Sequence, residues 1–330
     1  MVAKPNSVRE DHETYGWLSQ PNRHPQAPFR AAQITYPANL REALRQAQED
    51  PRKTLFGVAH GIPSVFVTKI LASTKPDFVW IDVEHGMFDR LTLHDAIHAA
   101  MTHSEGRAIV IVRVPKNDEI SLTTALDAGA AGIVMPHTES AEEVREMMKA
   151  MYFPPMGQRS FSPWTFTPGI SDASLYPEDP FNIRTSNQHV CLIPQIESVR
   201  GIENAEEIAS VPGVSALMFG FGDFMIDAGV PVKLGGEPHP KVAAAIGRFM
   251  AAAKSNGLPL FGGAQTPDMV PSMVGMGYAA IAIAFDYWGL ARLVHDGLVQ
   301  ARKSVAGEDA AEEGGKTQVA TNGHGAREEA

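Results

Sequence analysis

Two carboxylates follow two apolar segments of the chain, where they could act together as metal ligands. Glu197 follows the run VCLIPQI (190–196), and Asp223 follows ALMFGF (216–221). Neighbouring strands of a sheet lie about 4.8 Å apart, so the two carboxylates can converge on one ion. Carboxylates that leave positions open for water and substrate favour a hard divalent cation, Mg²⁺, with Mn²⁺ or Co²⁺ as alternatives. The other interpretation is a helix N-cap and a surface acid, although Ser198 is itself a good N-cap.

A second group of polar residues follows the apolar run FVWIDV (78–83). Asp82 and His85 form a carboxylate–imidazole combination that suits a general acid and base or an orienter of water. A structural Asp–His pair at a strand end is the alternative. Glu84 is expected to point away from the site, because alternate residues of a strand face opposite sides.

Arg113 ends the apolar run AIVIVRV (108–114), and a half-buried guanidinium needs an anion. That anion is either a substrate oxygen or Asp82, and both interpretations stay open. Trp80 alternates with Asp82, so its ring is expected inside the upper part of the sheet, mainly as core. The backbone N–H groups of Gly222 and Asp223 could meet a substrate carboxylate at a helix start.

The composition excludes several classes of protein. No lysine lies inside an apolar run, which disfavours Schiff-base chemistry. Cys191 is the only cysteine, so an intrachain disulfide and a cysteine zinc site are excluded, and a buried thiol in a cytoplasmic protein is expected. The net charge of −10 argues against nucleic acid as a partner. No apolar run approaches the roughly 20 residues that span a membrane.

Eight short apolar runs alternate with eight helical patterns, which predicts an α/β protein. The runs are 55–60, 78–83, 108–114, 132–136, 190–196, 216–221, 258–263 and 279–285, and the helices are 63–74, 91–103, 118–128, 140–151, 199–210, 239–256, 267–277 and 287–304. Continuously apolar strands are typical of a parallel sheet buried on both faces. Eight units predict a closed (β/α)₈ TIM barrel. An open doubly wound sheet is the alternative, but no nucleotide-binding glycine motif follows the first run.

The candidate residues follow the C-terminal ends of these runs, where the active sites of such barrels lie. The barrel is expected over residues 39–304, and it begins with a short amphipathic helix at 39–50. Its long loop, 153–189, is expected to serve as a lid or a subunit contact. An irregular N-terminal arm (1–38) and a disordered acidic tail (305–330) complete the chain.

Several motifs carry a family resemblance. In chain order they are WIDVEHG, VRVPKND, LDAGAAGIVMP, PPMGQRS, PQIES and GFGDF. Over about residues 54–304 the chain resembles the HpcH/HpaI aldolases, metal-dependent lyases that act through a pyruvate enolate. The resemblance implies that Glu197 and Asp223 bind the metal and that His85 and Asp82 are the acid/base pair. It also implies that Arg113 lies near the enolate oxygen. The pocket for the 2-oxo acid is then lined by Trp80, Gln195, Gly222 and Asp223.

The resemblance also suggests a reaction. Oxaloacetate decarboxylation is favoured, and the enolate would then be protonated or joined to an electrophile such as a 2-pyrone, as in a fungal member of the family. Phe181 stands where that member is expected to place a tyrosine hydroxyl against the pyrone, so the second substrate stays open. The alternatives are a retro-aldolase that cleaves 4-hydroxy-2-oxo acids to pyruvate and an aldehyde, and a non-catalytic metabolite-binding barrel. A homo-oligomer, trimer or hexamer, is expected from the same likeness.

Overall fold

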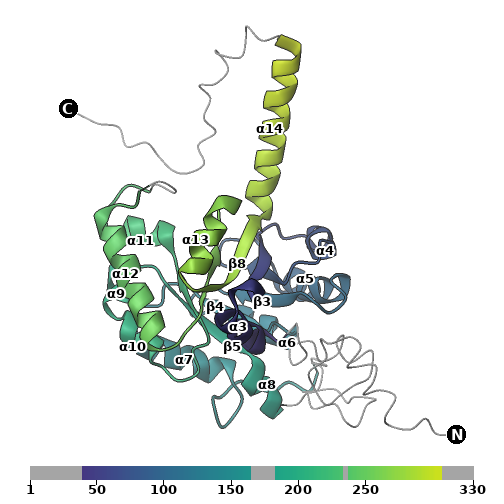
Figure 1. The fold of residues 1–330 in the computed structure, drawn as a ribbon. Coiled ribbons are helices and arrows are strands. Elements are labelled where there is room, and N and C mark those ends of the chain that lie inside the picture. The colour runs from purple at the N-terminus through teal and green to yellow at the C-terminus, as the bar shows by residue number, and fades with distance from the viewer. Residues whose placement is uncertain (1–38, 165–182, 233–236, 307–330) are drawn as a thin grey trace, which may run out of the picture.

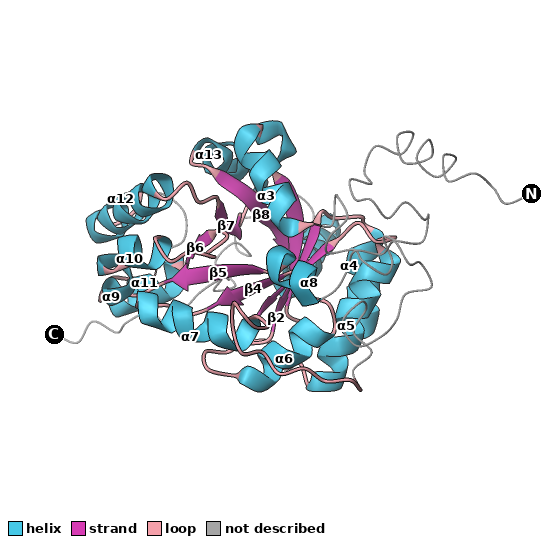
Figure 2. Cartoon of the chain, turned by 90° about the horizontal axis from the view of Figure 1, so that it is seen from below, coloured by secondary structure: helices cyan, strands magenta, loops and turns pink. Residues whose placement is uncertain are grey.

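Eight parallel strands form a closed barrel in which every strand pairs with its sequence neighbours and β8 pairs with β1 (Figures 1 and 2). The computed structural model describes residues 39–164, 183–232 and 237–306. The strands are β1 (Leu55–His60), β2 (Phe78–Asp82), β3 (Ile109–Arg113), β4 (Gly132–Met135), β5 (Cys191–Ile196), β6 (Leu217–Phe219), β7 (Leu260–Gly263) and β8 (Tyr278–Phe285). This topology confirms the predicted (β/α)₈ barrel, and each predicted strand end falls within two residues of the observed one.

Helices surround the barrel and follow most of its strands. They are α3 (Leu40–Glu49), α4 (Val65–Ser73), α5 (Arg90–His103), α6 (Glu119–Asp127), α7 (Ala141–Met151), α8 (Ile183–His189), α9 (Val199–Glu203), α10 (Ala205–Ala209), α11 (Phe221–Asp227), α12 (Pro240–Ser255), α13 (Val270–Gly275) and α14 (Asp286–Ala306), with 3₁₀ turns at Pro51–Lys53 and Pro267–Met269. None of the described helices is both long enough and apolar enough to cross a membrane.

The strands alternate between two apolar cores, as their period of two requires. In β2, Phe78 and Trp80 join the core that lines the barrel, whereas Val79 and Ile81 join the core between strands and helices. Helix α3 contributes Leu40 to the barrel core, and a Cβ built on Gly132 would lie 2.6 Å from that leucine. Helix α3 therefore closes the N-terminal end of the barrel (Figure 2), and the opposite end carries the candidate residues.

Three local features differ from the predicted pattern. Helix α11 is not among the eight predicted helices, although a helix start at Gly222 and Asp223 was considered, because the glycines of GFGD weaken the helical signal. Helix α8 lies inside the predicted long loop, where its polar sequence has no apolar period. It is attached through Asn187, whose side chain accepts from Phe153 N and donates to Phe153 O, both at 2.8 Å. The predicted helix over 199–210 divides at Asn204 into α9 and α10.

The predicted arm and most of the predicted tail lie outside the described residues, and so do residues 165–182 of the long loop. Helix α14 continues to Ala306, two residues into the range expected for the tail. The domain boundaries otherwise stay a prediction.

Helix α14 projects away from the barrel instead of lying against it (Figure 1). Most of its residues are exposed, and the large apolar ones among them include Leu290, Leu293 and Leu298. The outer face of β8, which such a helix would cover, is also exposed, and Ile283 on that face is 45% exposed. The eighth helix therefore leaves the outside of its own strand uncovered.

Candidate active site at the C-terminal mouth

Asp82 and Arg113 form a bidentate ion pair at the mouth of the barrel. The two residues are direct partners in the register of β2 and β3. Arg113 Nε donates to Asp82 Oδ1 at 2.9 Å, and Nη2 donates to Oδ2 at 2.6 Å. Both side chains are largely buried, so each neutralises a charge that burial would otherwise disfavour. The expected anion for Arg113 is thus present in the protein itself.

We expect Arg113→Met to lower the free energy of unfolding by about 3–5 kcal/mol, because it leaves Asp82 buried without its partner. Urea denaturation followed by circular dichroism measures the change. Arg145→Met is the matched control, since Arg145 pairs with Glu142 at the exposed surface of α7 and such pairs contribute at most about 1 kcal/mol. Equal losses in the two variants would contradict the burial argument.

The polar chain continues from Arg113 to Glu197 through Gln195. Arg113 Nη1 donates to Gln195 Oε1 at 3.5 Å, and Gln195 Nε2 donates to Glu197 Oε2 at 2.5 Å. Gln195 lies in β5 and Glu197 directly follows the strand, and their side chains lie on the same side because they are two residues apart. Four predicted site residues, from β2, β3 and β5, therefore form one hydrogen-bonded series.

Glu197 is only 1% exposed and is held on both oxygens. Its Oε1 accepts a hydrogen bond from the backbone N–H of His137 at 2.7 Å, while Gln195 donates to Oε2. Burial raises the pKa of Glu197, and the negative charge of Asp223 raises it further, although the His137 N–H opposes the shift. A buried carboxylate next to a second negative charge is stabilised by a cation.

Asp223 approaches from the first turn of α11, directly after β6. Strands β5 and β6 are paired neighbours, with Ile196 opposite Phe219, and this places α11 beside Glu197. Within the described ranges, no group of three or more His, Cys, Asp or Glu side chains has the arrangement of a metal site. The charge of Asp223 acts on Glu197, so the two carboxylates lie on the same side of the mouth, without a third protein ligand of these types among the described residues.

Gly220 makes the close approach of these elements possible. A Cβ at this position would lie 2.0 Å from Glu197 Oε2 and 2.6 Å from Glu197 Cβ. By contrast, a Cβ at Gly222 would meet no atom within 4 Å. Of the two glycines in the GFGD motif, Gly220 is thus the one that the packing of Glu197 requires.

His85 lies at the mouth, but its ring is not placed against Asp82 as predicted. Its side chain is 64% exposed, and the carboxylate closest to it is Glu84, with Nε2 to Oε2 at 3.8 Å. Asp82 Oδ1 instead accepts from the backbone N–H groups of Glu84 at 3.1 Å and His85 at 3.3 Å. Asp82 therefore shapes the turn that carries His85.

Glu84 does not point away from the site, and that expectation was wrong. Its Oε2 lies 3.2 Å from Arg113 Nε. The expectation counted the alternation wrongly, because residues two apart on a strand face the same side and Asp82 already faces the site. Burial raises the pKa of Glu84, whereas the charges of Arg113, His85 and His137 oppose that shift.

His137 is a further site residue that the sequence interpretation missed. It has a positive φ of 47°, and its ring lies 3.6 Å from Glu197 and 3.8 Å from Glu84. Its position directly after the end of β4 was an available signal, since the other candidates also follow strand ends.

Trp80 is almost fully buried and packs edge-to-face on Phe261 at 5.3 Å, which agrees with the predicted core role. The Arg113 guanidinium lies over its ring, 5.5 Å from the centroid. Its indole Nε1 has no hydrogen-bond partner among the described residues. A buried N–H without an acceptor is costly, so this donor fits an oxygen supplied by a bound molecule.

Phe181, which was expected to contact the second substrate, lies outside the described residues.

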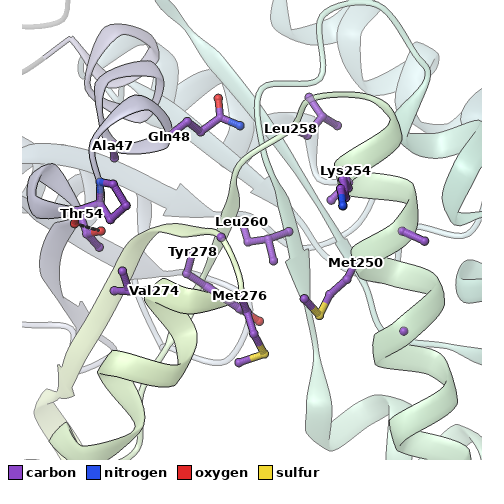
Figure 3. Close-up of a pocket in the computed structure, with 15 residues that line it drawn as sticks. Ala47, Gln48, Thr54, Met250, Lys254, Leu258, Leu260, Val274, Met276 and Tyr278 are labelled. Carbon is purple, nitrogen blue, oxygen red and sulfur yellow. Dashed lines mark hydrogen bonds between the residues drawn. The ribbon is translucent and has the colours of Figure 1, made fainter.

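A cavity of about 580 Å³ lies at the other end of the barrel, between α3, α12 and α13 (Figure 3). Leu260 and Tyr278, which begin β7 and β8, line it together with Met250 and Met276. None of the predicted site residues belongs to its lining. The hydrogen-bonded series, rather than this apolar cavity, is therefore the candidate active site.

The fold and this site define a class of enzyme. Residues 63–291 match the HpcH/HpaI aldolase/citrate lyase family, and the chain belongs to that family. This confirms the predicted class, a metal-dependent carbon–carbon lyase, and removes the non-catalytic alternative.

Individual relatives give the comparison more detail. The solved structure of macrophomate synthase is 66% identical, with a TM-score of 0.78 over 86% of this chain and 96% of that chain. The chain is 34% identical to 2-dehydro-3,6-dideoxy-6-sulfogluconate aldolase of Pseudomonas putida over 210 residues. The aligned region covers 64% of this chain and 78% of the relative. It is 31% identical over 224 residues to hydroxypyruvate/pyruvate aldolase of Delftia acidovorans, covering 67% and 78%.

Proposed function

We propose that this enzyme generates a pyruvate enolate from a 2-oxo acid, with oxaloacetate as the favoured substrate and CO₂ as the first product. The observation that carries this proposal is the series Asp82–Arg113–Gln195–Glu197, which reaches the carboxylate pair of Glu197 and Asp223. It combines a fixed cationic donor with two acidic oxygen ligands. The similarity to macrophomate synthase supports the same assignment.

Glu197 and Asp223 are proposed to hold a divalent cation, Mg²⁺ in the first instance, with Mn²⁺ or Co²⁺ as alternatives. The residues fit such an ion, because both ligands are hard oxygens and the charge of Asp223 acts on Glu197. Water and substrate oxygens would supply the remaining ligands. When bound, the ion polarises the 2-oxo carbonyl and stabilises the negative charge that develops on its oxygen.

The other side chains position the substrate and move a proton. Arg113, oriented by Asp82 and Gln195, is proposed to direct its N–H groups toward the developing enolate oxygen. Trp80 Nε1 supplies a further donor, and the backbone at Gly222 and Asp223 receives the substrate carboxylate. His85 is proposed to deliver the proton to C3 that converts the enolate into pyruvate.

The experiment compares two substrates, oxaloacetate and 4-hydroxy-2-oxovalerate, with the metal-loaded full chain. We expect pyruvate and CO₂ from oxaloacetate with the higher kcat/KM. The alternative, a retro-aldolase, is supported by similarity to a hydroxypyruvate/pyruvate aldolase. A higher kcat/KM for the hydroxy acid, with release of acetaldehyde, would establish the alternative. Product analysis with oxaloacetate and a 2-pyrone then shows whether the enolate is captured.

We also propose that the enzyme is a homo-oligomer, a trimer or hexamer, in which a second copy covers the exposed apolar side chains of α14. Leu293, in the middle of this helix, is strongly exposed. We expect light scattering to give the mass of three or six chains, and Leu293→Glu to reduce it. Lys303→Glu, near the end of the same helix, is the control for the added charge. A monomeric native protein would contradict this proposal.

A further inference from the structure

Tyr287 lies at the same level of the barrel as the ion pair of the candidate site. Ala59 of β1 pairs with Trp80 of β2 on one side and with Phe285 of β8 on the other. Asp82 ends β2 two residues after Trp80, and Tyr287 follows Phe285 by two residues in the first turn of α14, so both lie at the C-terminal mouth. None of the site assignments above includes Tyr287, which is the second residue of α14.

The first turn of α14 is fixed by a buried polar cluster. Asp286 accepts hydrogen bonds from the backbone N–H groups of Gly61 and Ile62, each at 3.0 Å. Its Oδ2 lies 2.8 Å from His60 Nδ1, and His60 Nε2 lies 2.7 Å from Thr68 Oγ1. The junction between β8 and α14 is thus attached to β1 and α4, although the rest of α14 projects away.

The ring of Tyr287 lies directly on Gly61. A Cβ at Gly61 would be 2.6 Å from the Tyr287 Cε1 atom, so the glycine makes room for the ring. Tyr287 also packs edge-to-face on Trp288, with centroids 5.3 Å apart. The buried polar cluster around Asp286 and these contacts hold the ring of Tyr287 in place, while 40% of the residue remains exposed.

The hydroxyl of Tyr287 is available as a donor. No hydrogen bond to it occurs among the described residues. Burial raises the pKa of Tyr287, the charge of Asp82 raises it further, and Arg113 opposes the shift. The phenol therefore stays protonated at neutral pH and can donate a hydrogen bond.

Tyr287 lies across the mouth from Glu197. Its ring packs on Gly61, directly after β1, and in the closed eight-stranded barrel β1 lies opposite β5, which Glu197 follows. A 2-oxo acid whose 2-oxo group and carboxylate are bound beside Glu197, with Arg113 at the 2-oxo oxygen, can extend its C4 end toward Tyr287.

We propose that Tyr287 binds the distal end of the substrate, where its hydroxyl donates to the oxygen-bearing group on C4. This inference rests on the proposed function, and it identifies the substrate class as 2-oxo acids with a carboxylate or hydroxyl at C4. Tyr287 is then a specificity residue for the group that leaves when the C3–C4 bond breaks. Pyruvate and oxalate, which have no C4, do not reach it.

The test compares Tyr287→Phe with the native metal-loaded enzyme. We measure kcat and KM for oxaloacetate and the inhibition constant of oxalate, a two-carbon probe of the carboxylate and 2-oxo subsite. We expect the variant to lower kcat/KM for oxaloacetate about tenfold, mainly through KM, since one hydrogen bond to a charged acceptor is lost. The oxalate constant should change less than about twofold. Tyr278→Phe, at the buried opposite end of β8, is the matched control and should change neither value.

The outcomes separate this inference from the proposed function. Unchanged kcat/KM in Tyr287→Phe, or equal losses in kcat/KM and oxalate affinity, would overturn the role at C4. If the native enzyme neither releases pyruvate from oxaloacetate nor is inhibited by oxalate, the proposed function itself fails. A selective loss with oxaloacetate supports the assignment of Tyr287.

Discussion

Replacing Glu197 by glutamine is expected to lower metal-dependent release of pyruvate from oxaloacetate at least about a thousandfold. The variant removes one of two proposed carboxylate ligands, and a bound metal contributes several kcal/mol of charge stabilisation in such reactions. Divalent cation affinity, measured by calorimetry on the same protein, should fall in parallel. Activity within about tenfold of the native value would contradict the ligand role of Glu197.

The same substitution should leave the fold intact, which separates loss of function from loss of structure. Burial and the charge of Asp223 raise the pKa of Glu197, so its charged form is disfavoured in the folded protein without a cation. A neutral amide of the same shape removes that unfavourable charge. The amide NH2 group loses one of the two hydrogen bonds that the carboxylate accepts, which offsets part of this gain. We therefore expect the metal-free Tm of Glu197→Gln to lie close to the native value. Glu207→Gln, on the exposed side of α10, is the matched control for activity.

Gly220→Ala is expected to reduce kcat/KM about a hundredfold or more, although it adds only one methyl group. The new Cβ would lie 2.0 Å from Glu197 Oε2 and 2.6 Å from Glu197 Cβ, so the carboxylate must move. Displacements of about 1 Å at a catalytic site cost rates of this size. Steady-state kinetics with oxaloacetate and a metal titration measure the effect.

The neighbouring glycine gives this prediction a close control. Gly222→Ala lies in the same motif and the same helix, yet its Cβ would meet no atom within 4 Å. Alanine retains the backbone N–H that is proposed to face the substrate carboxylate. We expect its kcat/KM to remain within about threefold of the native value. Similar losses in both variants would show that α11, rather than the position of Glu197, is sensitive to substitution.

The barrel was predictable because its signals are local and repeated. Each strand is a short, continuously apolar run, and parallel strands buried on both faces leave this pattern. Helix α11 was missed because glycines at positions 220 and 222 weaken helical propensity. The helix is short and buries only Phe224 and Met225, which is too few apolar residues to give a helical period. The projection of α14 was equally hidden, since its sequence predicts a helix but not the direction in which the helix leaves β8.

The site residues on strands were predictable, whereas their partners were not. Strand ends and the rule for barrel mouths indicated Asp82, Arg113 and Glu197. The sequence left open whether the anion beside Arg113 is Asp82 or a substrate oxygen. The register of β2 and β3, which places Asp82 directly opposite Arg113, brings these two side chains together. Glu84 was misplaced because residues two apart on a strand face the same side, and Asp82 already faces the site. Tyr287 comes near the site through the geometry of the first turn of α14, which spacing along the chain does not reveal, whereas His137 follows a strand end and the same rule could have found it.

The central claim is that a cation held by Glu197 and Asp223 enables this enzyme to form a pyruvate enolate. Its most direct test is pyruvate release from oxaloacetate by the full chain, first treated with EDTA and then supplied with Mg²⁺, Mn²⁺ or Co²⁺. Free metal also acts on oxaloacetate, so the rate with Glu197→Gln at equal metal concentration is subtracted. We expect EDTA to abolish the release of pyruvate and Mg²⁺ to restore it. Release of pyruvate that persists in EDTA, or no release above background with any of the three metals, would contradict the role proposed for the cation at Glu197 and Asp223.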